Sequence, residues 1–90
     1  HKGTIETVYS LLDGEYEFIE AEILEKSELL NKSIKDSNLP EHIRIGAVLR
    51  SEKVIIPRSD FIFEKGDLVV FLAKRELLQE VESIFRLSSI

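Results

Sequence analysis

The residues of this 90-residue chain that could do chemistry are few, and they lack the combinations that catalysis needs. There is no cysteine, which excludes a disulfide framework, a thiolate nucleophile and a cysteine-ligated metal. His42 has no second internal histidine to act with, and the chain contains neither a glycine-rich phosphate loop nor a His-x-x-x-His pair. We therefore expect no catalytic residue and no metal site, and the sequence argues against an enzyme.

Six glutamates near the start of the chain form its most conspicuous charge cluster. They are Glu15, Glu17, Glu20, Glu22, Glu25 and Glu28. Carboxylate oxygens can bind hard cations, but side chains two residues apart on a strand stand about 6.6 Å apart and converge poorly on one ion. This spacing favours a solvated acidic face.

Three arginines are better candidates for binding. Arg44 and Arg50 are expected on one face of a single strand, and Arg58 follows the strand that pairs with it. Their forked guanidinium donors suit the phosphate of a small anionic ligand, whereas ion pairs with the many glutamates would give them a structural role. His42, at the entrance of the same strand, could contact such a phosphate or be an ordinary exposed loop histidine.

Composition sets the class of protein. Ile, Leu, Val and Phe together make up 34 residues, which is enough apolar material for one folded domain and too much for a disordered chain. The net charge of −5 disfavours nucleic acid and anionic membrane surfaces as partners. The longest apolar run, residues 68–73, is far shorter than the ~20 residues of a bilayer-spanning helix. A soluble, cytoplasmic protein is expected.

Hydrophobic periodicity indicates the elements that must position these residues. Residues 1–14 are polar and are interpreted as a connector from a missing N-terminal domain, with residues 15–90 as the folded domain. Residues 15–25 alternate with period two and predict a strand, although their Glu and Ala content would also suit a helix. The alternation changes phase at Phe18 and Ile19, which requires a bulge or cover on both faces.

Residues 27–38 predict a short amphipathic helix, because Leu30 and Ile34 stand four residues apart. The helix should end just before Pro40, since proline disfavours the helical conformation of the residue that precedes it. Asn38 suits the left-handed position at such an end.

A hairpin is predicted next. Residues 42–50 alternate cleanly, and Ser51 and Glu52 connect them to a second strand that ends at Pro57. Two strands joined by two residues pair in antiparallel fashion.

The remainder of the chain predicts one more strand and a helix. Residues 68–73 are apolar without alternation, which indicates a strand covered on both faces, either central in the sheet or between the sheet and another layer. Gly66 in the preceding turn should take a positive φ. Residues 74–86 have the periodicity of an amphipathic helix. The predicted fold is therefore α+β, with a four-stranded, largely antiparallel sheet, helices on one side and the order β-α-β-β-β-α.

Several short motifs follow one another along the chain at a spacing that is specific only when they are taken together. They are Glu20-Ala21-Glu22, Leu39-Pro40-Glu41, Arg44-Ile45-Gly46-Ala47-Val48-Leu49-Arg50, Val54-Ile55-Ile56-Pro57-Arg58 and Phe63-Glu64-Lys65-Gly66-Asp67-Leu68-Val69-Val70-Phe71. As a set, over residues 4–85, they resemble the TrkA C-terminal domain. This is the ligand-sensing half of the regulators of potassium conductance (RCK).

The resemblance implies a non-catalytic regulatory domain that senses a ligand and forms a homodimer. It also implies an upstream RCK N-terminal domain that would bind NAD or ATP, so that no cofactor belongs to this fragment. The further partner would be a membrane potassium channel or transporter subunit, which places the domain in the cytoplasm at the inner face of the cell membrane. A purely structural dimerisation module of another ion transporter or regulator is the alternative.

The resemblance also suggests a site. Some relatives bind cyclic di-adenosine monophosphate, and Ile34, Leu39 and Pro57 match the apolar positions of that pocket. The arginine that those relatives use for a phosphate corresponds to Pro40 here. We therefore expect Arg44 to supply the charge for a small anionic ligand, with modest affinity.

Overall fold

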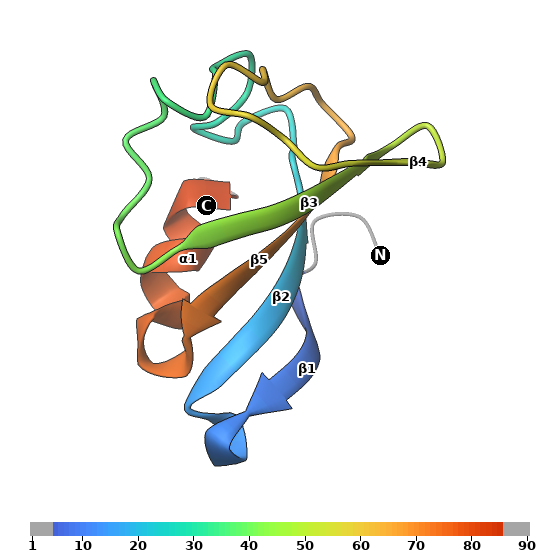
Figure 1. Cartoon of the computed structure of the whole chain (residues 1–90). Helices are drawn as coiled ribbons and strands as arrows, with labels where there is room; N and C mark the ends of the chain where they lie inside the picture. Colours follow the sequence, from blue (N-terminus) through green and yellow to red (C-terminus); the bar gives the residue numbers. More distant parts are fainter. Residues whose placement is uncertain (1–4, 86–90) are drawn as a thin grey trace.

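The computed structural model describes residues 5–85 as a five-stranded antiparallel sheet with one α-helix (Figure 1). The strands are β1 (Ile5–Leu11), β2 (Tyr16–Glu22), β3 (Arg44–Arg50), β4 (Lys53–Ile55) and β5 (Leu68–Lys74), in the spatial order β1-β2-β5-β3-β4. The helix is α1 (Leu78–Phe85), and short 3-10 turns cover Leu12–Gly14 and Arg75–Leu77. The predicted α+β class is confirmed, but the sheet has five strands where four were expected, and one α-helix where two were expected.

The fifth strand comes from the stretch that the sequence predicts to be a connector. β1 pairs with β2 along its whole length, so residues 5–11 belong to the sheet. The sequence did not predict this strand because its residues are mostly polar. They can be polar because β1 lies at the edge of the sheet, where only Ile5 and Leu11 are half-buried. That residues 1–14 also join a preceding domain stays a prediction.

β2 confirms the strand predicted over residues 15–25, but without the change of phase. Its register against β5 is unbroken, with Glu17 on the buried face and Phe18 on the opposite one. The sequence suggested a change of phase because the charged residue Glu17 occupies the buried face, where an apolar residue is expected. The bulge lies in the neighbouring strand instead, where Val8 is the extra residue opposite this point.

The short helix predicted over residues 27–38 does not form. The segment folds as successive turns with one β-bridge between Ser33 and Ile62. Several of its backbone amides donate to carbonyl oxygens of residues 59–63, so pairing with a distant segment overrides the helical spacing. Asn38 does take the expected left-handed conformation, with φ 54°.

The β3–β4 hairpin is confirmed. Arg50 lies opposite Lys53, and the two connecting residues, Ser51 and Glu52, have φ values of 52° and 65°. Positive φ at both central positions is the turn geometry whose twist matches that of paired strands.

A bulge at Gly46 changes which side chains of β3 share a face. The register of β3 against β5 shifts between Ile45 and Ala47, so Gly46 is the extra residue. Arg44 and Arg50 consequently lie on opposite faces of the sheet, and the prediction that they share one is wrong. Alternation counted through a bulge assigns every later residue to the wrong face.

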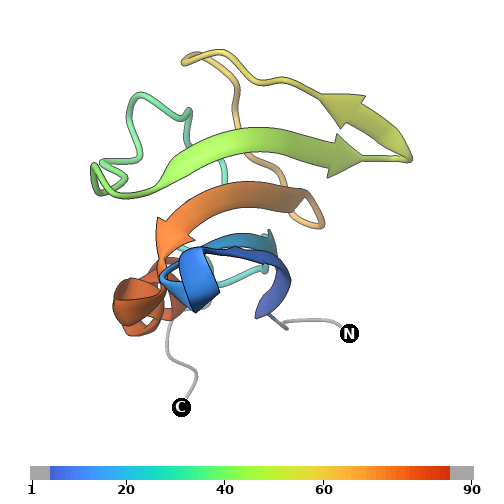
Figure 2. The ribbon, with the colours of Figure 1, turned by 60° about the horizontal axis from the view of Figure 1, so that its bottom comes forward.

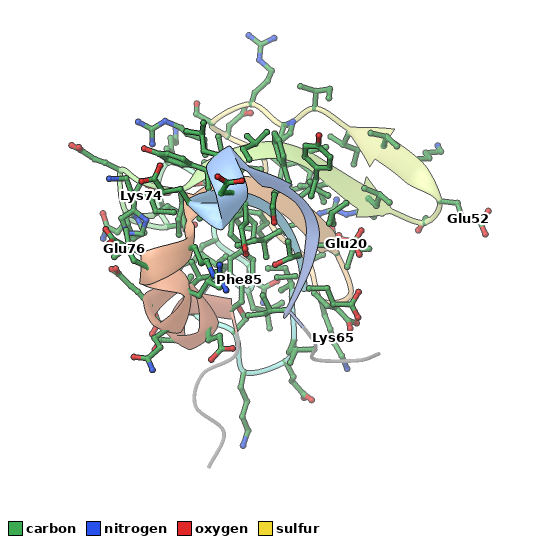
Figure 3. The ribbon with its side chains drawn as sticks, turned by 90° about the horizontal axis from the view of Figure 1, so that it is seen from below. Glu20, Glu52, Lys65, Lys74, Glu76 and Phe85 are labelled. Atoms are coloured by element: carbon green, nitrogen blue, oxygen red, sulfur yellow. The ribbon has the colours of Figure 1, made fainter. Side chains whose placement is uncertain are left out.

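The core lies between one face of the sheet, here called the core face, and a layer made of α1 and the long connections (Figure 2). Phe85, from the end of α1 (Figure 3), stacks on Phe71 of β5 with 4.9 Å between ring centroids. The central position of β5 is confirmed. The amphipathic helix predicted over residues 74–86 is confirmed for Leu78–Phe85, but its start is wrong, because Lys74 ends β5 and Arg75–Leu77 form a 3-10 turn; Arg86 lies outside the described residues. The expected cover on both faces of β5 is incomplete, because Val70 and Leu72 on its other face are only half-buried.

Gly66 has φ +90°, as predicted, and a Cβ atom built there would meet nothing within 4 Å. The cost of Gly66→Val is therefore one of backbone conformation alone, and we expect a loss of about 1 kcal/mol or more in the free energy of unfolding. Urea denaturation would measure it. Gly66→Asn should lose less, because asparagine tolerates positive φ; equal losses would contradict this explanation.

Candidate functional site

The four residues predicted to bind a ligand lie around one hollow beside the start of β3. Ile34 and Leu39 reach it from the turns before the strand, Arg44 from the first position of β3, and Pro57 from the segment after β4. The hollow has a volume of about 540 Å³ and opens to solvent. The structure brings these residues together in space, and their role in binding stays a prediction.

A tight turn directly before β3 forms part of the wall of the hollow. Asn38 reverses the backbone through its left-handed conformation, and the amide of Ile43 donates to the carbonyl of Pro40 over 3.1 Å. Ile43 itself is 3% exposed, so the turn is anchored in the core. Leu39 precedes Ile43 in this turn and Arg44 follows it, so the buried Ile43 side chain fixes the position of both.

The hollow is basic although the chain as a whole is acidic. Lys35, Arg44 and Arg58 line it, and no Asp or Glu is among its lining residues. The rest of the lining is mostly apolar, with Asn38 and Ser59 as the neutral polar side chains. A cluster of cations in a chain of net charge −5 concentrates anions locally.

Arg44 is oriented by its own turn. Its Nη1 donates to the backbone carbonyls of Glu41 and Ile43. Among the hydrogen bonds within residues 5–85, those of Arg44 use Nη1 only, which leaves Nε and Nη2 for a ligand. A guanidinium fixed at one nitrogen retains the fork that binds a phosphate or carboxylate through two bonds.

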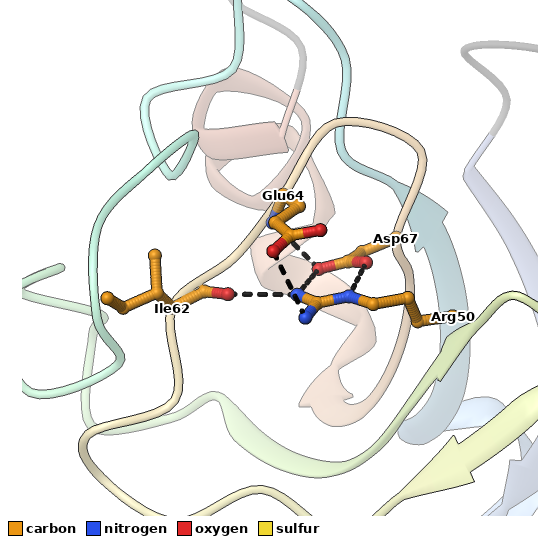
Figure 4. A network of polar contacts seen from close by, with 4 residues as sticks. All are labelled: Arg50, Ile62, Glu64 and Asp67. Atoms are coloured by element: carbon orange, nitrogen blue, oxygen red, sulfur yellow. Dashed lines mark hydrogen bonds and ion pairs between the residues drawn. The ribbon is translucent and has the colours of Figure 1, made fainter.

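Arg50 belongs to a structural network on the core face. Its Nε and Nη2 donate to the two carboxylate oxygens of Asp67, each over 2.7 Å, and Nη2 also donates to the Ile62 carbonyl (Figure 4). The hydrogen bond to Asp67, with the negative charges of Asp67 and Glu64, raises the pKa of Arg50. Asp67 is 1% exposed. For this arginine the ion-pair interpretation is correct, and sequence reasoning missed Asp67 as its partner.

His42 contacts α1 and is absent from the lining of the hollow. Its Nε2 lies 3.2 Å from Oε1 of Glu80, and its Nδ1 is buried without a hydrogen-bond partner in the described part of the chain. The contact joins the turn before β3 to the helix. The structure thus places His42 beside α1 and outside the lining of the hollow.

The glutamate cluster does not converge. Glu17 is buried at 6% exposure and accepts a hydrogen bond from Oγ1 of Thr7 over 2.7 Å, with Nε of Arg75 at 3.9 Å. Glu20 and Glu22 lie on the opposite face of β2. Within residues 5–85, no three His, Asp or Glu side chains gather closely enough to hold a metal ion.

The fold and the hollow define the class of protein: a small α+β domain with a basic, solvent-open hollow beside β3. Residues 18–86 match the family model of the TrkA-C domain, and the chain belongs to that family. The resemblance found in the sequence is thereby confirmed. No helix in the described range 5–85 is long and apolar enough to cross a membrane.

Curated relatives of the chain carry the same family name. The chain is 42% identical over 87 residues to the Trk system potassium uptake protein TrkA of Azorhizobium caulinodans. It is 35% identical over 92 residues to TrkA of Haemophilus influenzae, and 34% identical over 83 residues to a TrkA homolog of Archaeoglobus fulgidus. These matches cover 97%, 98% and 92% of this chain. They cover 19%, 20% and 19% of the relatives, so the chain spans about a fifth of their length.

Proposed function

We propose that this domain is a non-catalytic regulatory domain of a potassium transport system, which senses a small anionic ligand and forms a homodimer. Its family membership and the names of its relatives support the link to potassium uptake. The observation that carries ligand sensing is the hollow itself, whose lining combines three cations with mostly apolar residues in an otherwise acidic chain.

The partners of the proposal are those that the family resemblance implies. An upstream RCK N-terminal domain that binds NAD or ATP would precede the domain, and a membrane potassium channel or transporter subunit would be the regulated protein. The domain would then act in the cytoplasm at the inner face of the membrane. Nucleic acid is not among the proposed partners, because the net charge of −5 opposes a phosphate backbone.

The hollow suits a small ligand with an apolar part and a phosphate. Its volume of about 540 Å³ lies within the roughly 300–1,000 Å³ of small-molecule sites. Ile34, Leu39 and Pro57 would contact the apolar part, and Arg44 would donate charge-assisted hydrogen bonds to the phosphate. Pro40, which lines the same hollow, offers no donor, and this supports a modest affinity.

Removing the Arg44 side chain should weaken binding by about 1.5–3 kcal/mol, which is roughly 10- to 150-fold in Kd, because a charged hydrogen bond is lost. Isothermal titration with ATP and with cyclic di-adenosine monophosphate would compare Arg44→Ala with the unmodified chain. Arg75→Ala, at an exposed arginine that is absent from the lining of the hollow, is the matched control and should bind as before.

Two results would go against this proposal. Equal affinities for Arg44→Ala and the unmodified chain would remove Arg44 from the site. No heat with either nucleotide would favour the alternative, a structural dimerisation module that binds no such ligand.

A further inference from the structure

The turn that precedes Arg44 is held both by the core and by α1. A hydrogen bond from the Ile43 amide to the Pro40 carbonyl closes the turn, and the Ile43 side chain is buried. His42 lies inside the same turn, and its Nε2 is 3.2 Å from Oε1 of Glu80 on α1. In Figure 1 the turn, green and just before β3, lies beside the helix. A movement of the turn would therefore break a contact with α1.

The two ring nitrogens of His42 have different surroundings. An ionised carboxylate can only accept hydrogen bonds, so Nε2 is the nitrogen that carries hydrogen and donates to Glu80. Nδ1 is buried and has no hydrogen-bond partner within residues 5–85. The side chains of His42 and Glu80 are 23% and 51% exposed. A contact with so exposed a carboxylate contributes little to the stability of the fold, so removing it should leave the domain folded.

The backbone on either side of His42 links this contact to Arg44. The carbonyl of Glu41 belongs to the peptide unit that joins Glu41 to His42, and it accepts a hydrogen bond from Nη1 of Arg44. The carbonyl of Ile43, on the other side of His42, accepts from the same nitrogen over 3.2 Å. A displacement of the His42 backbone would move both acceptors. Anchoring the His42 side chain on α1 therefore fixes the groups that orient the guanidinium.

We propose that His42 and Glu80 are positioning residues for Arg44, which keep its Nε and Nη2 available to an anion in the hollow. The inference rests on the proposed function, because it concerns the same site. Neither residue is among those that line the hollow, so their effect on a ligand passes through Arg44. An arginine that is already ordered loses less conformational entropy when it binds. By linkage, an anion bound to Arg44 would in turn stabilise the contact between the turn and α1.

The first test needs no ligand. Nitrogen NMR relaxation measures how well ordered Nε of Arg44 is in the free chain. His42→Ala should lower its order parameter, because the carbonyls that hold Nη1 are then no longer fixed. His42→Gln should restore the order, since the glutamine side-chain nitrogen is as many bonds from Cβ as Nε2 of histidine and can donate to Glu80. His42→Asn should not restore it, because the asparagine side chain is too short to reach Glu80.

The second test measures binding of ATP and of cyclic di-adenosine monophosphate by NMR titration. His42→Ala and Glu80→Ala should each weaken binding about two- to ten-fold, which corresponds to the cost of ordering one long side chain. The double variant should lose no more than either alone, because the two residues act as one contact. When Arg44 is already replaced by alanine, His42→Ala should have no further effect. Glu82→Ala, at an exposed carboxylate of the same helix, is the matched control and should bind as before.

The outcomes separate this inference from the proposed function. If neither nucleotide binds the unmodified chain, ligand sensing fails, while the order parameter of Arg44 still decides the positioning role. An unchanged order parameter in His42→Ala would overturn the inference. A loss that His42→Gln does not restore would also overturn it, because that is the result expected of a purely structural residue. The same would follow from an equal effect of His42→Ala with and without the Arg44 side chain.

Discussion

Replacing Arg50 by alanine should lower the free energy of unfolding by about 3 kcal/mol or more, because it leaves the Asp67 carboxylate buried without its cation. Asp67 is 1% exposed, and both of its oxygens accept hydrogen bonds from Arg50. The guanidinium also lies 4.7 Å from the centroid of the Phe61 ring. One side chain therefore connects β3, the turn before β5 and the segment between them.

The loss should be the same at neutral and at mildly alkaline pH. The hydrogen bond to Asp67 raises the pKa of Arg50. A cation whose pKa is raised by folding contributes its stabilisation at every pH below its unfolded pKa, and the contribution is lost only as the pH rises through the folded value. Because both values lie above the mildly alkaline range, no titration of Arg50 intervenes there.

Urea denaturation of matched variants would test this network. Arg58→Ala removes an exposed arginine and should change stability by no more than about 0.5 kcal/mol. Asp67→Asn should fall between, because the variant keeps an acceptor for the amide of Glu64 but loses the charge. An Arg50→Ala variant as stable as Arg58→Ala would contradict the assignment of Arg50 to a buried ion pair.

The second large effect is expected at the contact between α1 and the sheet. Phe85→Ala should lower the free energy of unfolding by about 3–5 kcal/mol, the usual range for a buried aromatic side chain. Phe85 is fully buried and stacks on Phe71 at an interplanar angle of 4°. A helix of eight residues is too short to persist alone, so it depends on this packing.

The measurement is again urea denaturation, combined with circular dichroism in the helical region. Glu82→Ala, at an exposed position of the same helix, is the control and should stay within about 0.5 kcal/mol of the unmodified chain. A domain of this size has a total stability of only about 5–13 kcal/mol, so Phe85→Ala could prevent folding altogether. Phe85→Leu would then serve, with an expected loss of about 1–2 kcal/mol. Equal effects at residues 82 and 85 would contradict the docking of α1 through Phe85.

The candidate hollow shows what a resemblance adds to local patterns. Periodicity alone gives no reason to group Ile34, Leu39, Arg44 and Pro57, which come from three separate segments. The family motifs placed them together, and the structure puts all four around one hollow. Arg58 was already a candidate for binding an anion, whereas Lys35, which adds to the positive charge of the hollow, was found only once the segments were folded against each other.

Local chemistry determined the parts of the fold that depend on neighbours in the chain. The hairpin at Ser51 and Glu52, the positive φ of Gly66, the central strand and the amphipathic α1 could all be predicted. Each depends on a turn or a hydrophobic period within a dozen residues. Such signals are complete in the sequence itself.

Only the tertiary structure decided the features that depend on register between distant segments. The bulge at Gly46 put Arg44 and Arg50 on opposite faces, and the bridge from Ser33 to Ile62 replaced a helix with turns. Pairing with β2 turned the polar residues 5–11 into an edge strand. In each case the free energy of a long-range pairing outweighs a local preference. The sequence of one segment does not identify the distant segment with which it pairs in the folded chain.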